Sequence, residues 1–281
     1  MSIIPDILYG MPNTLLFIIM CIAGIIFTVI GIHLIRAVIP IELRLKDNVA
    51  IGYISANTAV LFAVLAGFVI SYMLGNFSRA QEITRTEVNH LNDICRDASR
   101  LGEPMAGEIH KEVKDYLEAV IKQEWPVMQE GRAINPSYGE KILTSLRIKL
   151  VRYKTKDINQ SLALADLHKG LEEVYNARSE RLSMHGSALG ADVWIMLVIV
   201  TLFTIIINFV YGMEHYLHLV LAPVVSTVVI SLLFIIIIID RPFRGGLSVT
   251  SKDFQRAFAE MQQVNNMGSI AESVGNFSKK T

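Results

Sequence analysis

Residues 15–34 read LLFIIMCIAGIIFTVIGIHL, a run without a single Asp, Glu, Lys or Arg. A helix needs roughly 20 such residues to cross about 30 Å of hydrocarbon, and a helix in a soluble core would instead show a polar stripe. Residues 226–239, STVVISLLFIIIII, have the same character. Comparable apolar runs cover residues 14–35, 51–75, 192–212 and 216–239. We therefore predict an all-α integral membrane protein with four transmembrane helices, two within 14–75 and two within 191–240.

Composition supports a membrane partner and argues against nucleic acid. The 281 residues are 52% hydrophobic, and Lys plus Arg balance Asp plus Glu at 26 each, so no charge excess favours a polyanion. The two cysteines, Cys21 and Cys95, are too few and too differently placed for a disulfide framework or a zinc cluster. The N-terminus lacks the basic start and small-residue cleavage site of a secretory signal, so we expect the first apolar run to remain as a span.

Basic residues near the span ends predict the orientation. Three segments fall on one side of the membrane: the N-terminal tail 1–13, the middle domain 76–190 and the C-terminal segment 241–281. They supply Arg79, Arg85, Arg178, Arg181, Arg241, Arg244 and Lys252 near the membrane, whereas the other side has Arg36, Arg44 and Lys46. By the positive-inside rule we expect a multi-pass protein of the inner (plasma) membrane with both termini in the cytoplasm.

The polar middle of the chain is predicted to form a cytoplasmic helical bundle. Apolar residues recur at helical spacing after the second span, so this span should continue as one long helix to the break at 102–104. Pro104 can open a second helix that ends near Trp125 and Pro126, because proline disfavours helix in the residue before it. A loop over 131–139 and helices over 142–153 and 158–182 follow, and an amphipathic stretch at 252–264 should dock on the bundle or on a neighbouring subunit.

The second span differs from the others in its small and polar residues. Asn57 and Thr58 place hydrogen-bonding groups where lipid cannot satisfy them, and Ser71 and Tyr72 continue along the same helix. We predict that these four residues line a pore. A tight seam between helices, which small residues also favour, is the alternative that sequence leaves open.

Val60, Val64 and Phe68 follow one another at intervals of four residues on this span. Repeated around a symmetry axis, such an apolar stripe forms a constriction that can gate ions by dewetting. Contact of the stripe with lipid or with a neighbouring helix is the simpler interpretation of the spacing alone.

Short sequence strings support a family resemblance over about residues 14–256. They are AGFV at 66–69, NFSRAQ at 76–81, EVN at 87–89 and DRPF at 240–243, with Val249 and Phe254 beyond. In these strings and in its order of spans the chain resembles the bestrophin anion channels, and more closely the bacterial bestrophin-like family. The resemblance implies a homo-oligomer with the second spans around a central axis, permeating anions such as chloride, and a neck at Phe68.

Departures from the animal bestrophins limit what the resemblance implies. Phe243 is followed by Arg244 and two glycines rather than by a dense acidic cluster, so oxygen-rich calcium coordination is not expected and we predict no cofactor. Arg241 and Arg244 are predicted to lie at the cytoplasmic membrane surface, where they would contact anionic lipid.

Two other classes of function remain as alternatives. His33, His215 and His218 would lie on the same outer side and could hold a haem or a metal, and Glu87 with His90 forms one Glu-x-x-His, where a di-iron bundle needs two. A membrane-anchored scaffold would share most of the other features. The sequence contains no phosphate loop, nucleophile elbow or His-Glu-x-x-His, so we do not expect an enzyme.

Overall fold

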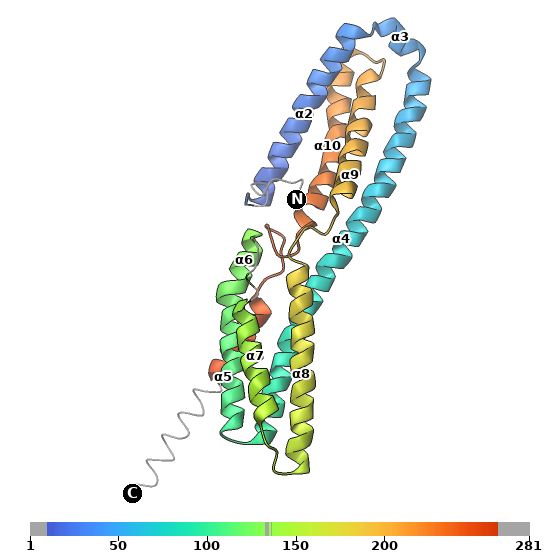
Figure 1. Ribbon diagram of the computed structural model, residues 1–281. Coiled ribbons are helices and arrows are strands. Elements are labelled where there is room, and N and C mark those ends of the chain that lie inside the picture. The colour runs from blue at the N-terminus through green and yellow to red at the C-terminus, as the bar shows by residue number, and fades with distance from the viewer. Residues whose placement is uncertain (1–9, 133–134, 136, 264–281) are drawn as a thin grey trace. The chain divides into compact units, whose positions relative to one another are not determined.

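In a computed structural model, residues 10–132, 135 and 137–263 are described, and all regular structure within them is helical, which confirms the all-α prediction (Figure 1). The elements are α2 Asn13–Val38, α3 Ile41–Lys46, α4 Asn48–Ala98, η1 Ser99–Leu101, α5 Met105–Ala119, η2 Val120–Glu124, α6 Trp125–Glu130, α7 Ser137–Arg152, α8 Ile158–Ser183, α9 Ala191–Ile206, η3 Ile207–Val210, α10 His215–Ile239 and a helix over 252–263.

The chain divides into two compact units, and α4 contributes to both. The first unit combines the residues up to Ser78 with Ser187–Ser248, and the second combines Arg79–Gly186 with the residues from Val249 on. The segment after the fourth span is thus shared, because its first residues belong to the first unit and the helix over 252–263 belongs to the second. Parts of the predicted terminal segments, residues 1–9 and 264–281, lie outside the described residues.

Four helices that lie wholly or partly in the first unit are long and apolar enough to cross a membrane. They cover Asn13–Val38, Asn48–Leu101, Ala191–Val210 and His215–Ile239, so each contains most of one predicted span. The second of them continues far beyond the length that a membrane requires and ends only at the glycine break, which confirms the prediction of one long helix.

Close packing of α2 on α10 forms one side of the first unit. A Cβ atom added at Gly24 would lie 1.8 Å from Ile230 Cδ1, and the Thr28 hydroxyl donates to the Ser226 hydroxyl at 2.7 Å. Gly31 faces the ring of Phe209, where an added Cβ would lie 2.1 Å from Cε2. At Gly24 the nearest atom is the flexible end of Ile230, which can move aside, whereas at Gly31 a side chain would press on the Phe209 ring of η3. Both glycines let α2 approach its neighbours closely.

The first part of α4 packs against the rest of the first unit along a single face. Phe62, Ala66, Val69 and Met73 are buried in its apolar core, at the spacing of one helical stripe. Ser55, on the same face, donates to the Asn208 side chain at 3.4 Å. This stripe leaves the opposite face of the helix uncovered by the chain itself.

One helix boundary predicted in the second unit is wrong. The helix predicted to end near Trp125 and Pro126 continues to Glu130. A π-helical stretch, Val120–Glu124, joins α5 to α6. Pro126 then lies in the first turn of α6, where a backbone N–H has no obligatory partner inside the helix. The helix ends at Gly131, which adopts the left-handed conformation with φ 69°.

Buried charges connect the helices of the second unit. Arg181 donates to Glu87 at 2.7 Å and to Glu124 at 2.8 Å, and Arg178 donates to Glu124 at 2.8 Å. Tyr116 also donates to Glu87, at 2.5 Å. Because Glu87 is fully engaged by these donors, the Glu-x-x-His string that it begins is part of an internal ion network rather than half of a di-iron site.

The helix over 252–263 docks on this network, as predicted for the amphipathic stretch. The Phe254 ring is fully buried, with its centroid 5.7 Å from that of Trp125 and 5.5 Å from the Arg181 guanidinium carbon. Phe258 lies under the Lys114 ammonium at 5.9 Å. Aromatic and cation–π contacts therefore attach this helix to the bundle.

Candidate functional site

The uncovered face of α4 carries the three residues predicted to form a constriction. Val60, Val64 and Phe68 are 61%, 52% and 73% exposed. At about 3.6 residues per turn they lie roughly opposite the buried stripe through Ala66 and Met73. The structure thus brings the three together on one continuous apolar face that no other part of the first unit covers.

Polar groups accompany this apolar stripe. Asn57 and Ser71 are exposed on the same side of the helix, and neither side chain has a hydrogen-bond partner within the described part of the chain. An exposed amide on a membrane span is unfavourable against lipid, and such residues face protein or water.

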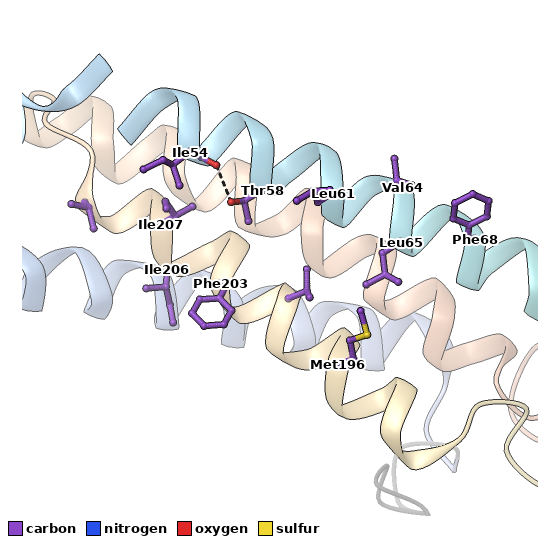
Figure 2. A pocket seen from close by; sticks show the side chains of 12 residues that line it. Ile54, Thr58, Leu61, Val64, Leu65, Phe68, Met196, Phe203, Ile206 and Ile207 are labelled. Carbon is purple, nitrogen blue, oxygen red and sulfur yellow. Dashed lines mark hydrogen bonds between the residues drawn. The ribbon is translucent and has the colours of Figure 1, made fainter. Parts of the chain in front are cut away.

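The other two predicted pore residues lie differently. The Thr58 side chain is half-buried and projects toward α9, where its hydroxyl donates to the Ile54 carbonyl at 2.8 Å (Figure 2). Tyr72 is 57% exposed. It follows Ser71 directly in the sequence, so it lies on a different side of the helix from Ser71. Only Asn57 and Ser71 therefore share the face of the valine stripe.

The exposed face of α2 provides a contrast within the same unit. Between positions 15 and 30 its exposed large side chains are all apolar: Leu15, Ile18, Ile19, Ile22, Ile25, Ile26, Phe27 and Ile30. This is the composition expected of a surface against lipid. The uncovered face of α4 differs from it in its amide, hydroxyl and glycine positions.

An apolar groove lies between α4 on one side and α9 with η3 on the other, and its lining includes two residues of the stripe, Val64 and Phe68 (Figure 2). It has a volume of about 800 Å³ and is lined by Ile54, Thr58, Leu61, Val64, Leu65, Phe68, Met196, Val200, Phe203, Ile206, Ile207 and Val210. This groove is not predicted by the sequence. The only sequence signal for the groove was a row of apolar residues at helical spacing: Ile54, Leu61 and Leu65. Such a row looks the same as an ordinary helix-packing face.

The three histidines proposed as weak metal candidates meet at one end of the first unit. The rings of His33 and His215 lie edge to face with centroids 5.7 Å apart. His218 is buried, and its Nε2 donates to the Asn208 carbonyl at 2.8 Å. Within the described residues, no group of three or more His, Cys, Asp or Glu side chains could hold a metal ion.

Arg241 and Arg244 follow the fourth span in a tight turn in which the Arg244 amide donates to the Arg241 carbonyl at 3.1 Å. Both residues are buried rather than exposed. The neighbouring Asp240 accepts hydrogen bonds from Ser187 at 2.8 Å and from the amide of Leu189. Their contact with lipid headgroups stays a prediction.

The fold is that of an all-helical protein with four helices long and apolar enough to span a membrane and with a second, polar helical unit. Comparison with known proteins gives the family: the Bestrophin-like domain matches residues 22–254, so the chain belongs to the bestrophin-like family. No curated protein sequence matches it.

Solved structures support the fold at low sequence identity. The chain is similar to a mutant of a bacterial bestrophin homologue from Klebsiella pneumoniae, with a TM-score of 0.64 and 12% identity over 88% of this chain and 98% of that one. A second mutant of the homologue gives a TM-score of 0.66 at 10% identity, covering 88% and 99% of the two chains. The resemblance stated from the sequence is thereby confirmed for family and fold.

Proposed function

We propose that the protein is a homo-oligomeric ion channel of the membrane, in which the uncovered face of α4 from each subunit lines a central axis. The observation that carries the proposal is the combination on one face of an apolar stripe, Val60, Val64 and Phe68, with the unpartnered Asn57 and Ser71. Inside an oligomer, this face would give the amide and hydroxyl access to water and would bring the apolar stripes of the subunits together. Facing lipid, it would leave the amide without a partner.

In this arrangement Val60, Val64 and Phe68 form a hydrophobic constriction. Apolar rings of this kind control conduction by expelling water from a narrow path rather than by binding ions. Asn57 on one side and Ser71 on the other would line the wider, hydrated parts.

We assign anions as the permeating species, by analogy with the bestrophin anion channels. The proposal does not depend on charged side chains in the constriction, because α4 carries no Lys, Arg, Asp or Glu between Asn48 and Ser78. The partners are the lipid bilayer, further copies of the chain and the permeating ions. The function is transport rather than catalysis.

The proposed orientation places both termini and the second unit in the cytoplasm, with the loop between α2 and α4 outside. Arg36, Arg44 and Lys46 are the basic residues at that outer end, fewer than those near the opposite ends of the spans. A membrane-impermeant maleimide added to intact cells should label Lys46→Cys and spare Lys156→Cys. The reverse labelling would invert the topology.

Planar-bilayer recording of the purified protein under a chloride gradient tests the channel. We expect a current whose reversal potential follows chloride and whose single-channel conductance rises several-fold in Phe68→Ala, because a smaller ring of side chains admits water more readily. Leu74→Ala is the matched control, since Leu74 is also exposed on α4 but lies about a third of a turn from Phe68.

Two results would contradict the proposal. The first is an absence of current from an intact oligomer of both wild type and Phe68→Ala. The second is an equal rise in Phe68→Ala and Leu74→Ala, which would mean that loss of bulk anywhere on α4 loosens the protein.

A further inference from the structure

Two arginines converge on one short loop at the end of the first unit where α3 joins α2 to α4 (Figure 1). The loop is the turn between η3 and α10. Arg36, in the last turn of α2, donates through Nη2 to the Met213 carbonyl at 2.9 Å. Arg44, on α3, donates through Nη1 to the Tyr211 carbonyl at 3.4 Å. Two guanidinium groups from different helices therefore bind carbonyls only two residues apart.

Neither arginine is neutralised by an acid. Among residues 10–132, 135 and 137–263, no carboxylate lies within ion-pair distance of Arg36 or Arg44, although the chain forms such pairs with many other arginines. Glu42 and Asp47, which lie on either side of Arg44 in the sequence, and Glu214, beside the loop, are exposed and make no ion pair with these two arginines. Two cations thus share a small region without a counter-charge from the described chain.

Part of their hydrogen-bonding capacity is unused although it is removed from solvent. The Nε atoms of Arg36 and Arg44 are buried and have no acceptor, and neither has Nδ1 of the neighbouring His215. Arg44 as a whole is only 3% exposed. A buried guanidinium is normally paired, because an unpaired buried charge is strongly unfavourable.

The electrostatics of Arg44 agree with this geometry. Its burial lowers the pKa of the guanidinium, and the nearby positive charge of Arg36 lowers it further. Arginine does not lose its proton in proteins, so both groups stay charged, and an anion beside them would offset the unfavourable burial and the mutual repulsion.

The loop that carries the two acceptors is held rigidly. Asn48 donates to the Gly212 carbonyl at 3.1 Å and accepts from the Gly212 amide at 3.1 Å. A Cβ atom added at Gly212 would lie 2.6 Å from the backbone of Arg44, so only glycine allows the loop to approach α3 this closely. The arginines are therefore fixed in place before any ligand arrives.

From this arrangement we infer an oxyanion-binding site between Arg36 and Arg44, with the His218 ring against Arg36, that takes a phosphate group. Guanidinium groups pair with tetrahedral oxyanions through two parallel hydrogen bonds, which a halide cannot match. The site lies at the ends of two membrane spans, so the phosphate can belong to a phospholipid headgroup or to free inorganic phosphate. This inference does not depend on the proposed channel.

Binding to the detergent-purified full-length protein tests the site by titration calorimetry, at constant ionic strength set with sodium chloride. The probes are inorganic phosphate and dioctanoyl phosphatidylglycerol, each applied to wild type, Arg36→Gln and Arg44→Lys. Loss of one charge-assisted contact should weaken binding about 10- to 100-fold in Arg36→Gln. Arg44→Lys keeps the charge but loses the planar fork, so it should also bind more weakly. Lys46→Gln removes an equal charge from an exposed position on α3 and should bind as wild type does.

The two probes separate the two sources of phosphate. Arginine-dependent binding of inorganic phosphate identifies a soluble oxyanion site, and arginine-dependent binding of the phospholipid alone identifies a headgroup site. If neither probe binds, or if Arg36→Gln and Lys46→Gln weaken binding equally, the proposed site does not exist. Arg44→Lys, which keeps the positive charge, keeps the test valid if Arg36→Gln does not fold.

Discussion

At the scale of single residues, the buried pairs of Arg181 dominate the second unit. Arg181, Glu87 and Glu124 are fully buried, so removing one partner would leave an uncompensated charge in a medium of low dielectric. In the sequence, Glu87 stands out only in two short strings, the EVN of the family resemblance and a metal-like Glu-x-x-His. The sequence could not identify Arg181 as the partner, because 94 residues separate the two and no local pattern connects them.

We expect Arg181→Ala to lower the free energy of unfolding of the second unit by about 3–5 kcal/mol. Chemical denaturation of the detergent-solubilised protein, followed by Trp125 fluorescence, measures the effect. Arg79→Ala is the control, since Arg79 also binds a glutamate, Glu180, but is half exposed, and it should change stability far less. Equal effects of the two substitutions would show that the buried network is not a stabilising element.

Glu124 makes the stability of the second unit dependent on pH. Burial alone would raise the pKa of its carboxyl, but the positive charges and hydrogen bonds of Arg181 and Arg178 outweigh burial and hold the pKa below its usual range. Because the folded-state pKa is lowered, this contribution is complete above the ordinary glutamate pKa of about 4.3 and is lost as pH falls through the lower value.

The melting temperature of wild type should therefore fall between about pH 5 and pH 3. The Glu124→Gln variant should start from a lower melting temperature but show a shallower decline over the same range. Parallel pH profiles of the two proteins would exclude Glu124 as a source of the acid sensitivity.

At the scale of helices, the sequence predicted what depends on local pattern. The four spans, the long continuation of α4 and its end at Gly102 follow from hydropathy, spacing and glycine chemistry. The prediction near Trp125 and Pro126 was wrong because it applied the proline rule without the π-helical stretch that places Pro126 in a first turn. Tertiary packing selects such a stretch, so a pattern of apolar residues does not reveal it.

The contact of α2 with η3 gives a prediction at this scale. Gly31→Ala should lower the melting temperature of the first unit, because the new methyl group would overlap the Phe209 ring and the cost of overpacking is about 1–3 kcal/mol. Gly75→Ala on α4 is the matched control, since an added Cβ meets nothing within 4 Å and alanine favours helix. A thermal scan that ranks Gly75→Ala as the more damaging of the two would contradict this packing.

At the scale of the whole molecule, the uncovered face of α4 is the feature that one chain leaves incomplete. The spacing of Val60, Val64 and Phe68 predicted a shared face, and the structure places them on one. The sequence could not separate Asn57 and Ser71, which accompany the stripe, from Thr58, which projects toward α9, because that distinction depends on the position of another helix. The number of subunits is likewise a property of contacts between chains.

The measurement that most directly tests a water-lined axis is modification of current by a charged, membrane-impermeant methanethiosulfonate reagent. It is applied to Asn57→Cys in a background in which Cys21 and Cys95 are replaced by alanine. We expect the reagent to change the current through open Asn57→Cys channels and to leave Ile22→Cys, on the apolar exposed face of α2, unaffected. Unchanged current in Asn57→Cys, or equal modification of both variants, would contradict the assignment of this face of α4 to the pore.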